Sequence, residues 1–99
     1  MSDDTGLGFA PPPFDAESAL AQLRRALREL KLAERGQAFE LRGKRVLELA
    51  PAADSIAVKM ARKLALTPEW DRQTVQSAAA QRKLLDEVKK RLARWEQED

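Results

Sequence analysis

The sequence predicts an α+β fold, in which a small antiparallel sheet packs with three helices in the order α-β-β-α-(β)-α. Leucines recur at steps of three and four residues in two segments, as in amphipathic helices. Between them, the stretch AFELRGKRVLEL (38–49) places a glycine between two short apolar runs, as in a β-hairpin. The sheet is expected to be this hairpin alone or three strands, and the alternative is a mainly helical fold with one hairpin.

The composition indicates one small domain with a highly charged surface. The chain has 99 residues, of which 43% are apolar and 34% charged. Residues 1–13 contain two glycines, three consecutive prolines and little that could pack, so we expect a flexible tail. Residues 14–99 are then expected to form the single globular domain.

The first helix is predicted over 15–35. Asp15 is a suitable N-cap, and Glu17 favours the positive end of the helix dipole. Gly36 stands where a left-handed C-cap is needed. One face carries the leucines 20, 23, 27 and 30.

The 38–49 stretch is predicted to be a hairpin because a helix would carry Gly43 internally and would scatter the apolar side chains. A two-residue loop of Arg42 and Gly43 would pair Phe39 with Val46 and Leu41 with Lys44, which mixes apolar and charged groups on one face. A three-residue loop that adds Lys44 separates them, so we favour it. This register pairs Phe39 with Leu47 and Leu41 with Arg45. It turns inward Phe39, Leu41, Leu47 and Leu49, and outward Ala38, Glu40, Val46 and Glu48.

A second helix is predicted over 54–66, where Ile56, Met60 and Leu64 fall four residues apart behind a cap at Asp54 or Ser55. It should end before the Thr67-Pro68 pair, because the residue preceding a proline is pushed out of helical geometry.

The segment 72–76 is predicted to be a third strand, because a lone two-stranded hairpin is marginal in water. The alternative is one continuous helix over 68–95. The last helix is predicted over 78–96, with Ser77 as its cap. Its apolar face is expected to consist of Leu85, Val88, Leu92 and Trp95, with Leu84 beside them. Pairs four residues apart, Asp86 with Lys90 and Glu87 with Arg91, mark a solvated face.

The side chains for common enzyme chemistry are scarce. The sequence has no cysteine, histidine or tyrosine, and Ser55, Ser77 and Thr67 are better explained as helix caps. The remaining route to catalysis is a carboxylate pair, for which the candidates are Glu40, Glu48, Glu69 and Asp71. No glycine-rich segment has phosphate-loop spacing, and acidic residues cluster only near the chain ends. We therefore expect no enzyme activity and no catalytic, cofactor-binding or metal-binding residues.

The basic residues are concentrated in the middle of the sequence. Residues 24–45 contain eight basic and three acidic residues, although the net charge of the whole chain is only +2. Several of them step by three and four along the first helix, and others surround the hairpin tip. The tryptophan one turn from the C-terminus is a further candidate, because helix ends in small domains seldom bury a tryptophan completely. The predicted contact surface consists of Arg24, Arg28, Lys31, Arg35, Arg42, Lys44, Arg45 and Trp95.

These observations predict a small interaction, adaptor or regulatory protein without enzyme activity. Its expected partner is another protein or a second copy of the chain. The alternative is a nucleic-acid-binding protein that uses the basic stripe of the first helix and the hairpin tip. No secretory signal or membrane-spanning stretch is evident in the sequence, so we expect a cytoplasmic protein and no membrane partner.

Overall fold

The computed structural model describes residues 14–97, and the predicted tail over 1–13 lies outside this range. The fold is α+β, as predicted, but it has five strands rather than two or three, and two helices rather than three. The strands form one antiparallel sheet in which chain order is also spatial order. The elements are α1 (Ala16–Glu29), β1 (Ala33–Arg35), β2 (Ala38–Leu41), β3 (Lys44–Pro51), β4 (Ile56–Ala61), β5 (Trp70–Val75) and α2 (Ala78–Trp95).

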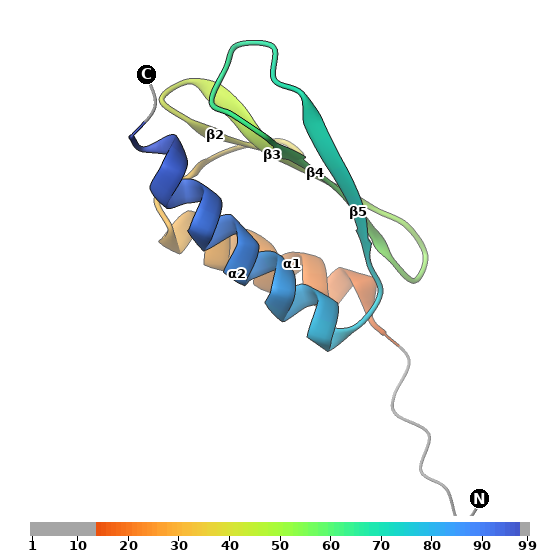
Figure 1. Cartoon of the computed structure of the whole chain (residues 1–99). Helices are drawn as coiled ribbons and strands as arrows, with labels where there is room; N and C mark the ends of the chain where they lie inside the picture. The colour runs from red at the N-terminus through yellow and green to blue at the C-terminus, as the bar shows by residue number, and fades with distance from the viewer. Residues whose placement is uncertain (1–13, 98–99) are drawn as a thin grey trace, which may run out of the picture.

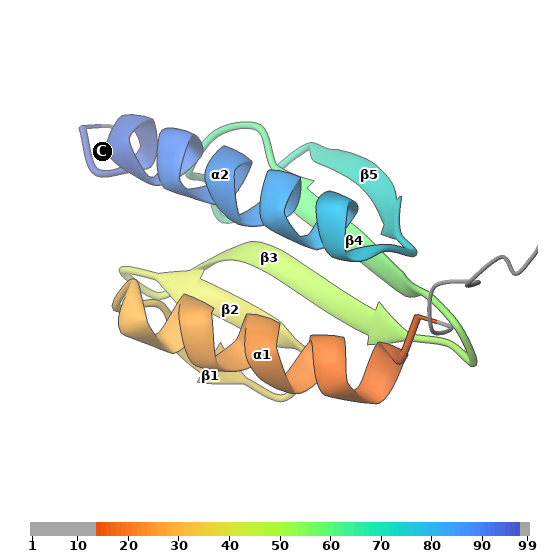
Figure 2. The same cartoon turned by 90° about the horizontal axis from the view of Figure 1, so that it is seen from below.

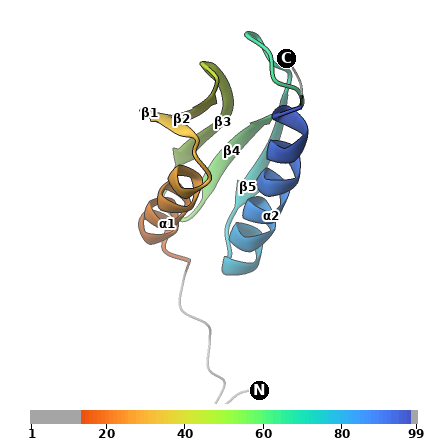
Figure 3. The same cartoon turned by 90° about the vertical axis from the view of Figure 1, so that its left-hand side faces the viewer.

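Both helices lie on the same face of the sheet, side by side and running in the same direction (Figures 1 and 2). The side-chain amide of Gln81 on α2 donates a hydrogen bond of 2.8 Å to the side-chain carbonyl of Gln22 on α1. The single core lies between this helix layer and the sheet, and its largest members include Trp95, Phe39 and Leu23. Figure 3 shows that, in the described part of the chain, no helix covers the other side of the sheet, which we call the open face.

Helix α1 begins as predicted but ends earlier. One carboxylate oxygen of Asp15 accepts hydrogen bonds from the backbone N–H groups of Glu17 and Ser18, at 3.1 and 3.2 Å. The helix ends at Glu29, and Lys31 takes the left-handed conformation with φ 73°. The residues that follow pair with β2, so the predicted end at 35 is wrong. Gly36, with φ 60°, lies in the turn between β1 and β2 instead of capping a helix.

The β2–β3 hairpin combines the two registers that the sequence allows. At the tip, Arg42 and Gly43 form a two-residue loop, and their φ angles of 55° and 79° are those of a type I′ turn. The three-residue loop and the pairing of Leu41 with Arg45 are therefore wrong, because Leu41 pairs with Lys44. A β-bulge then shifts the register, so that Phe39 pairs with Leu47 as predicted.

The residue inserted by this bulge is Val46. It is fully buried, although the regular alternation placed it on the polar face. Phe39, Leu47 and Leu49 are buried as predicted, and Leu41 packs against the core while remaining partly exposed. The bulge therefore turns one more apolar side chain of β3 toward the core than strict alternation allows.

The predicted helix over 54–66 is wrong, because Ile56–Ala61 forms strand β4. Ile56, Val58 and Met60 alternate along it and are buried, so the same residues satisfy a period of two as well as a period of four. The long strand β3 supplies the deciding interaction, since its second half extends beyond β2 and pairs with β4. Tertiary pairing has overridden the local helical pattern.

The last two elements agree with the sequence. Strand β5 confirms the predicted third-strand segment and excludes a continuous helix over 68–95, although it begins two residues earlier than expected, at Trp70. Helix α2 starts after Ser77, whose hydroxyl oxygen accepts a hydrogen bond from the N–H of Ala80 at 3.0 Å. The buried row on α2 is Leu84, Val88, Leu92 and Trp95, with Leu85 only partly buried.

Candidate functional site

The basic stripe on α1 is engaged by a carboxylate of the neighbouring strand. Glu34 on β1 points to the helix side of the sheet, where one oxygen lies 2.8 Å from the guanidinium of Arg28 and the other 3.5 Å from that of Arg24. Lys31 lies beyond the helix end and is exposed. Two of the predicted contact residues are thus held in ion pairs at the edge of the helix layer.

Three basic residues of the strands, Arg35, Arg45 and Lys59, are also paired, but on the open face. Arg35 lies 3.7 Å from Glu40, and Arg45 lies 3.6 Å from Glu48. Lys59 approaches the same Glu48 at 4.0 Å. The C-terminal end of α1 and the β2–β3 tip are at the same end of the molecule (Figures 1 and 2), but their paired cations lie on different sides of the sheet.

Trp95 does not belong to the contact surface, because it is fully buried in the core. The prediction of an exposed tryptophan at this helix end is wrong. The hairpin tip reaches this end of α2. There the guanidinium of Arg42 donates a hydrogen bond of 3.0 Å to the backbone carbonyl of Glu96. The hairpin therefore helps to hold the last turn of α2 in place.

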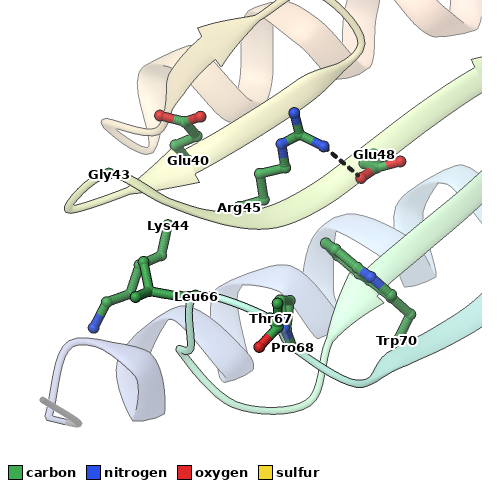
Figure 4. Close-up of a pocket in the computed structure, with 9 residues that line it drawn as sticks. All are labelled: Glu40, Gly43, Lys44, Arg45, Glu48, Leu66, Thr67, Pro68 and Trp70. Carbon is green, nitrogen blue, oxygen red and sulfur yellow. Dashed lines mark ion pairs between the residues drawn. The ribbon is translucent and has the colours of Figure 1, made fainter.

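A hollow of about 360 Å³ opens between the β2–β3 hairpin and the segment that leads into β5 (Figure 4). Its wall is apolar on one side and charged on the other. The apolar side includes Leu66, which is 82% exposed, and Trp70, which is half-buried and extends toward Arg45 and Glu48. The lining residues are Glu40, Gly43, Lys44, Arg45, Glu48, Leu66, Thr67, Pro68 and Trp70.

The apolar side of this hollow was not predicted, because Leu66 to Pro68 were interpreted as the end of one helix and Thr67 as a possible cap of the next. Leu66 is the one large apolar side chain in the described part of the chain that is exposed. A signal was available in the sequence, since a leucine and a tryptophan flank a proline in a segment that lacks helical periodicity.

The carboxylates considered for catalysis are all held in ion pairs. Glu40 and Glu48 are paired on the open face, and Glu69 lies 3.6 Å from Arg62. Asp71 lies 2.8 Å from Arg62 and 2.9 Å from Arg91. Hydrogen bonds from these two guanidinium groups lower the pKa of Asp71. An acid held ionised in this way is poorly suited to donating a proton at neutral pH.

Two other carboxyl groups also have lowered pKa values, and hydrogen bonds again explain them. A hydrogen bond from Arg91 lowers the pKa of Glu87, and hydrogen bonds from Ser18 lower that of Asp15 at the start of α1. Within residues 14–97, no three His, Cys, Asp or Glu side chains gather in a group that could hold a metal ion. The lowered pKa values of these carboxyl groups are thus explained by ion pairs and by a helix cap.

A second cationic surface lies on α2, although the numbers of acidic and basic residues in the sequence do not reveal it. The predicted pair of Glu87 with Arg91 is present at 2.9 Å, but no ion pair joins Asp86 to Lys90. The chain beyond residue 66 has equal numbers of acidic and basic residues, so a count of charges does not show this surface. A helical wheel of 78–95 would have placed most of the cations of α2 on the side opposite the apolar row.

Comparison of the chain with protein-family models, with curated proteins and with solved structures finds no match. In the part of the chain that the structure describes, neither helix combines the length and apolar character needed to cross a bilayer. The class that the fold defines is a small α+β protein, with a two-helix layer on one face of a five-stranded antiparallel sheet and a charged, hollowed open face on the other.

Proposed function

We propose that this protein is a non-enzymatic interaction module, which binds a protein partner or a second copy of itself at the hollow on the open face. The observation that carries the proposal is the exposure of Leu66 beside Pro68 and Trp70. Fully burying a leucine side chain contributes about 1.5–3 kcal/mol, and tryptophan is among the residues enriched at binding hot spots.

The charged side of the hollow supports the same function. Arg45 and Glu48 present a cation and an anion on one strand, 3.6 Å apart, at the edge of the apolar surface. A partner segment with an apolar side chain next to charged residues would match both sides of this wall. The mixed charge weighs against a purely anionic ligand at this position.

The nucleic-acid alternative that uses α1 and the hairpin tip stays a prediction, as does the cytoplasmic location. Glu34 engages Arg24 and Arg28, and Glu40 and Glu48 engage the strand arginines. These ion pairs reduce the positive potential that a phosphate backbone would meet.

The experiment compares wild type with Leu66→Asp and with the matched control Ala21→Asp, which adds the same charge at an exposed position of α1. Light scattering over a range of concentrations reports self-association. Proteins captured by each variant from a lysate are identified by mass spectrometry, and binding of the purified partner is then measured by calorimetry.

We expect Leu66→Asp to weaken partner binding or self-association at least about tenfold, because it places a charge in an apolar contact. Ala21→Asp should bind like wild type. A protein that is monomeric at all concentrations and captures the same proteins with and without Leu66→Asp would rule out this function for the hollow.

A further inference from the structure

The outer side of α2 carries a row of cations that point away from the core. In helical projection they occupy an arc of about 140°, opposite the buried stripe of the same helix. Asp86 is the one acidic residue within this arc. All five cations are exposed, and we call them the cationic row: Arg82, Lys83, Lys89, Lys90 and Arg94.

Of the two acidic residues near this row, Asp86 is exposed within the arc, and only Glu87 is bound elsewhere. Glu87 lies at the edge of the arc, but its carboxylate is 2.9 Å from the guanidinium of Arg91. Arg91 turns toward the sheet, where it also binds Asp71. Among residues 14–97, no ion pair involves a member of the cationic row. The row therefore presents nearly all of its charge to solvent.

We propose that the cationic row binds the phosphate backbone of double-stranded nucleic acid. From Arg82 to Arg94 the row extends about 18 Å along the helix axis, at 1.5 Å per residue. Duplex DNA carries one negative charge per roughly 1.7 Å of its axis, so a stretch of this length holds more phosphates than the row has cations. This surface is on the helix layer and is separate from the hollow on the open face.

The observations favour a duplex over a membrane surface. A helix that binds a bilayer inserts its apolar face below the headgroups. The apolar face of α2, which includes Leu84, Val88 and Trp95, is already buried against the sheet and α1. Only the polar face of this helix is free to make contacts.

The observations on α2 also favour a duplex over a single strand. Proteins that hold single strands combine cations with aromatic side chains on which bases stack. The outer arc of α2 carries no aromatic residue, and both tryptophans lie away from it, Trp95 in the core and Trp70 on the open face. Contacts through phosphates alone predict binding without base specificity.

The test measures the anisotropy of a fluorescently labelled 24-base-pair DNA duplex between 50 and 200 mM salt. For about five phosphate contacts, the slope of log K against log salt should be about −4.5, and affinity should fall roughly 10²–10³-fold over this range. The double variant K89E/K90E should bind at least about tenfold more weakly at 50 mM salt, with a slope smaller by about two.

The control is R28E/K31E, which changes the net charge by the same amount on α1. It should bind the duplex within about threefold of wild type, because Arg28 is already paired with Glu34. Circular dichroism confirms that each variant is folded. Leu66→Asp should leave duplex binding unchanged, so this proposal and the one for the hollow fail independently.

Three results would overturn the proposal. The first is no binding of the duplex at 50 mM salt, including the case in which vesicles containing phosphatidylserine bind instead. The second is an equal loss in K89E/K90E and R28E/K31E, which would mean that net charge alone attracts the duplex. The third is tighter binding of the single strand than of the duplex.

Discussion

The guanidinium of Arg91 on α2 lies 2.9 Å from the carboxylate of Asp71 on β5, and this ion pair joins the last helix to the edge strand of the sheet. The same guanidinium lies 2.9 Å from Glu87 and donates a hydrogen bond of 3.2 Å to the carbonyl of Ala61 on β4. With its side chain only 15% exposed, Arg91 is the most enclosed cation of this network.

Replacement of Arg91 by alanine should therefore destabilise the protein by about 1–3 kcal/mol, because it removes three charge-assisted contacts and leaves Asp71 with Arg62 alone. The matched control is Arg94→Ala on the exposed side of the same helix, which should change the free energy of unfolding by less than about 0.5 kcal/mol. Urea unfolding measures both. Equal effects of the two variants would contradict the structural role of Arg91.

The stability of the protein should fall in acid. The pKa values of Asp71 and Glu87 are lowered in the folded state from ordinary values of 3.8 and 4.5, because arginines bind their ionised forms. A lowered pKa gives stability that is present above the unfolded pKa and lost as the pH falls through the folded pKa. We expect the thermal midpoint to be steady near neutral pH and to decline below about pH 4.5.

Asp71→Asn isolates the contribution of this carboxylate. It should lower the midpoint at pH 7 and flatten the decline in acid, whereas Asp86→Asn, at an exposed position on α2, should leave the shape of the profile unchanged. If the thermal midpoint declines identically in acid in wild type and in Asp71→Asn, other groups govern that decline.

Lys31 offers a position at which a substitution should stabilise the fold. Its φ of 73° is a left-handed conformation, which glycine adopts without the steric cost that a side chain brings. Lys31→Gly should raise the free energy of unfolding by about 0.5–1 kcal/mol. Lys31→Ala keeps the steric conflict and should show no such gain, so chemical denaturation of the two variants separates backbone strain from loss of the lysine.

Val46 tests the β-bulge. If the strand alternated regularly, this side chain would face solvent and Val46→Ala would be neutral. Because the bulge buries it fully, the substitution should cost about 2 kcal/mol. Thr74→Ala, at an exposed position of β5, is the control and should have little effect. A neutral Val46→Ala would contradict the register shift.

The features that the sequence predicted correctly are those governed by neighbouring residues. The caps at Asp15 and Ser77 accept hydrogen bonds from the backbone close by, and the apolar periods of both helices were long enough to identify them. The pairing of Phe39 with Leu47 also agrees with the prediction, but the β-bulge produces it, not the three-residue loop that the sequence favoured.

The features that it predicted wrongly depend on distant contacts. The segment 56–61 suits either a helix or a strand, and pairing with the second edge of β3 decides between them. Burial of Trp95 depends on a hairpin more than fifty residues away, whose Arg42 reaches Glu96. The charge of the cationic row is neutralised less than the sequence suggests, because Arg91 binds the neighbouring Glu87 and also Asp71 of β5.

The adjacency of α1 and α2 has a consequence for biosynthesis. The strands pair with their neighbours in chain order, so the sheet can assemble progressively as it leaves the ribosome. The apolar face of that sheet, however, is covered by two helices, of which α1 precedes the strands in the sequence and α2 follows them. Until α2 has been translated, the part of this surface that it covers stays exposed to solvent, so a nascent chain that pauses before residue 78 should be prone to aggregate without a chaperone.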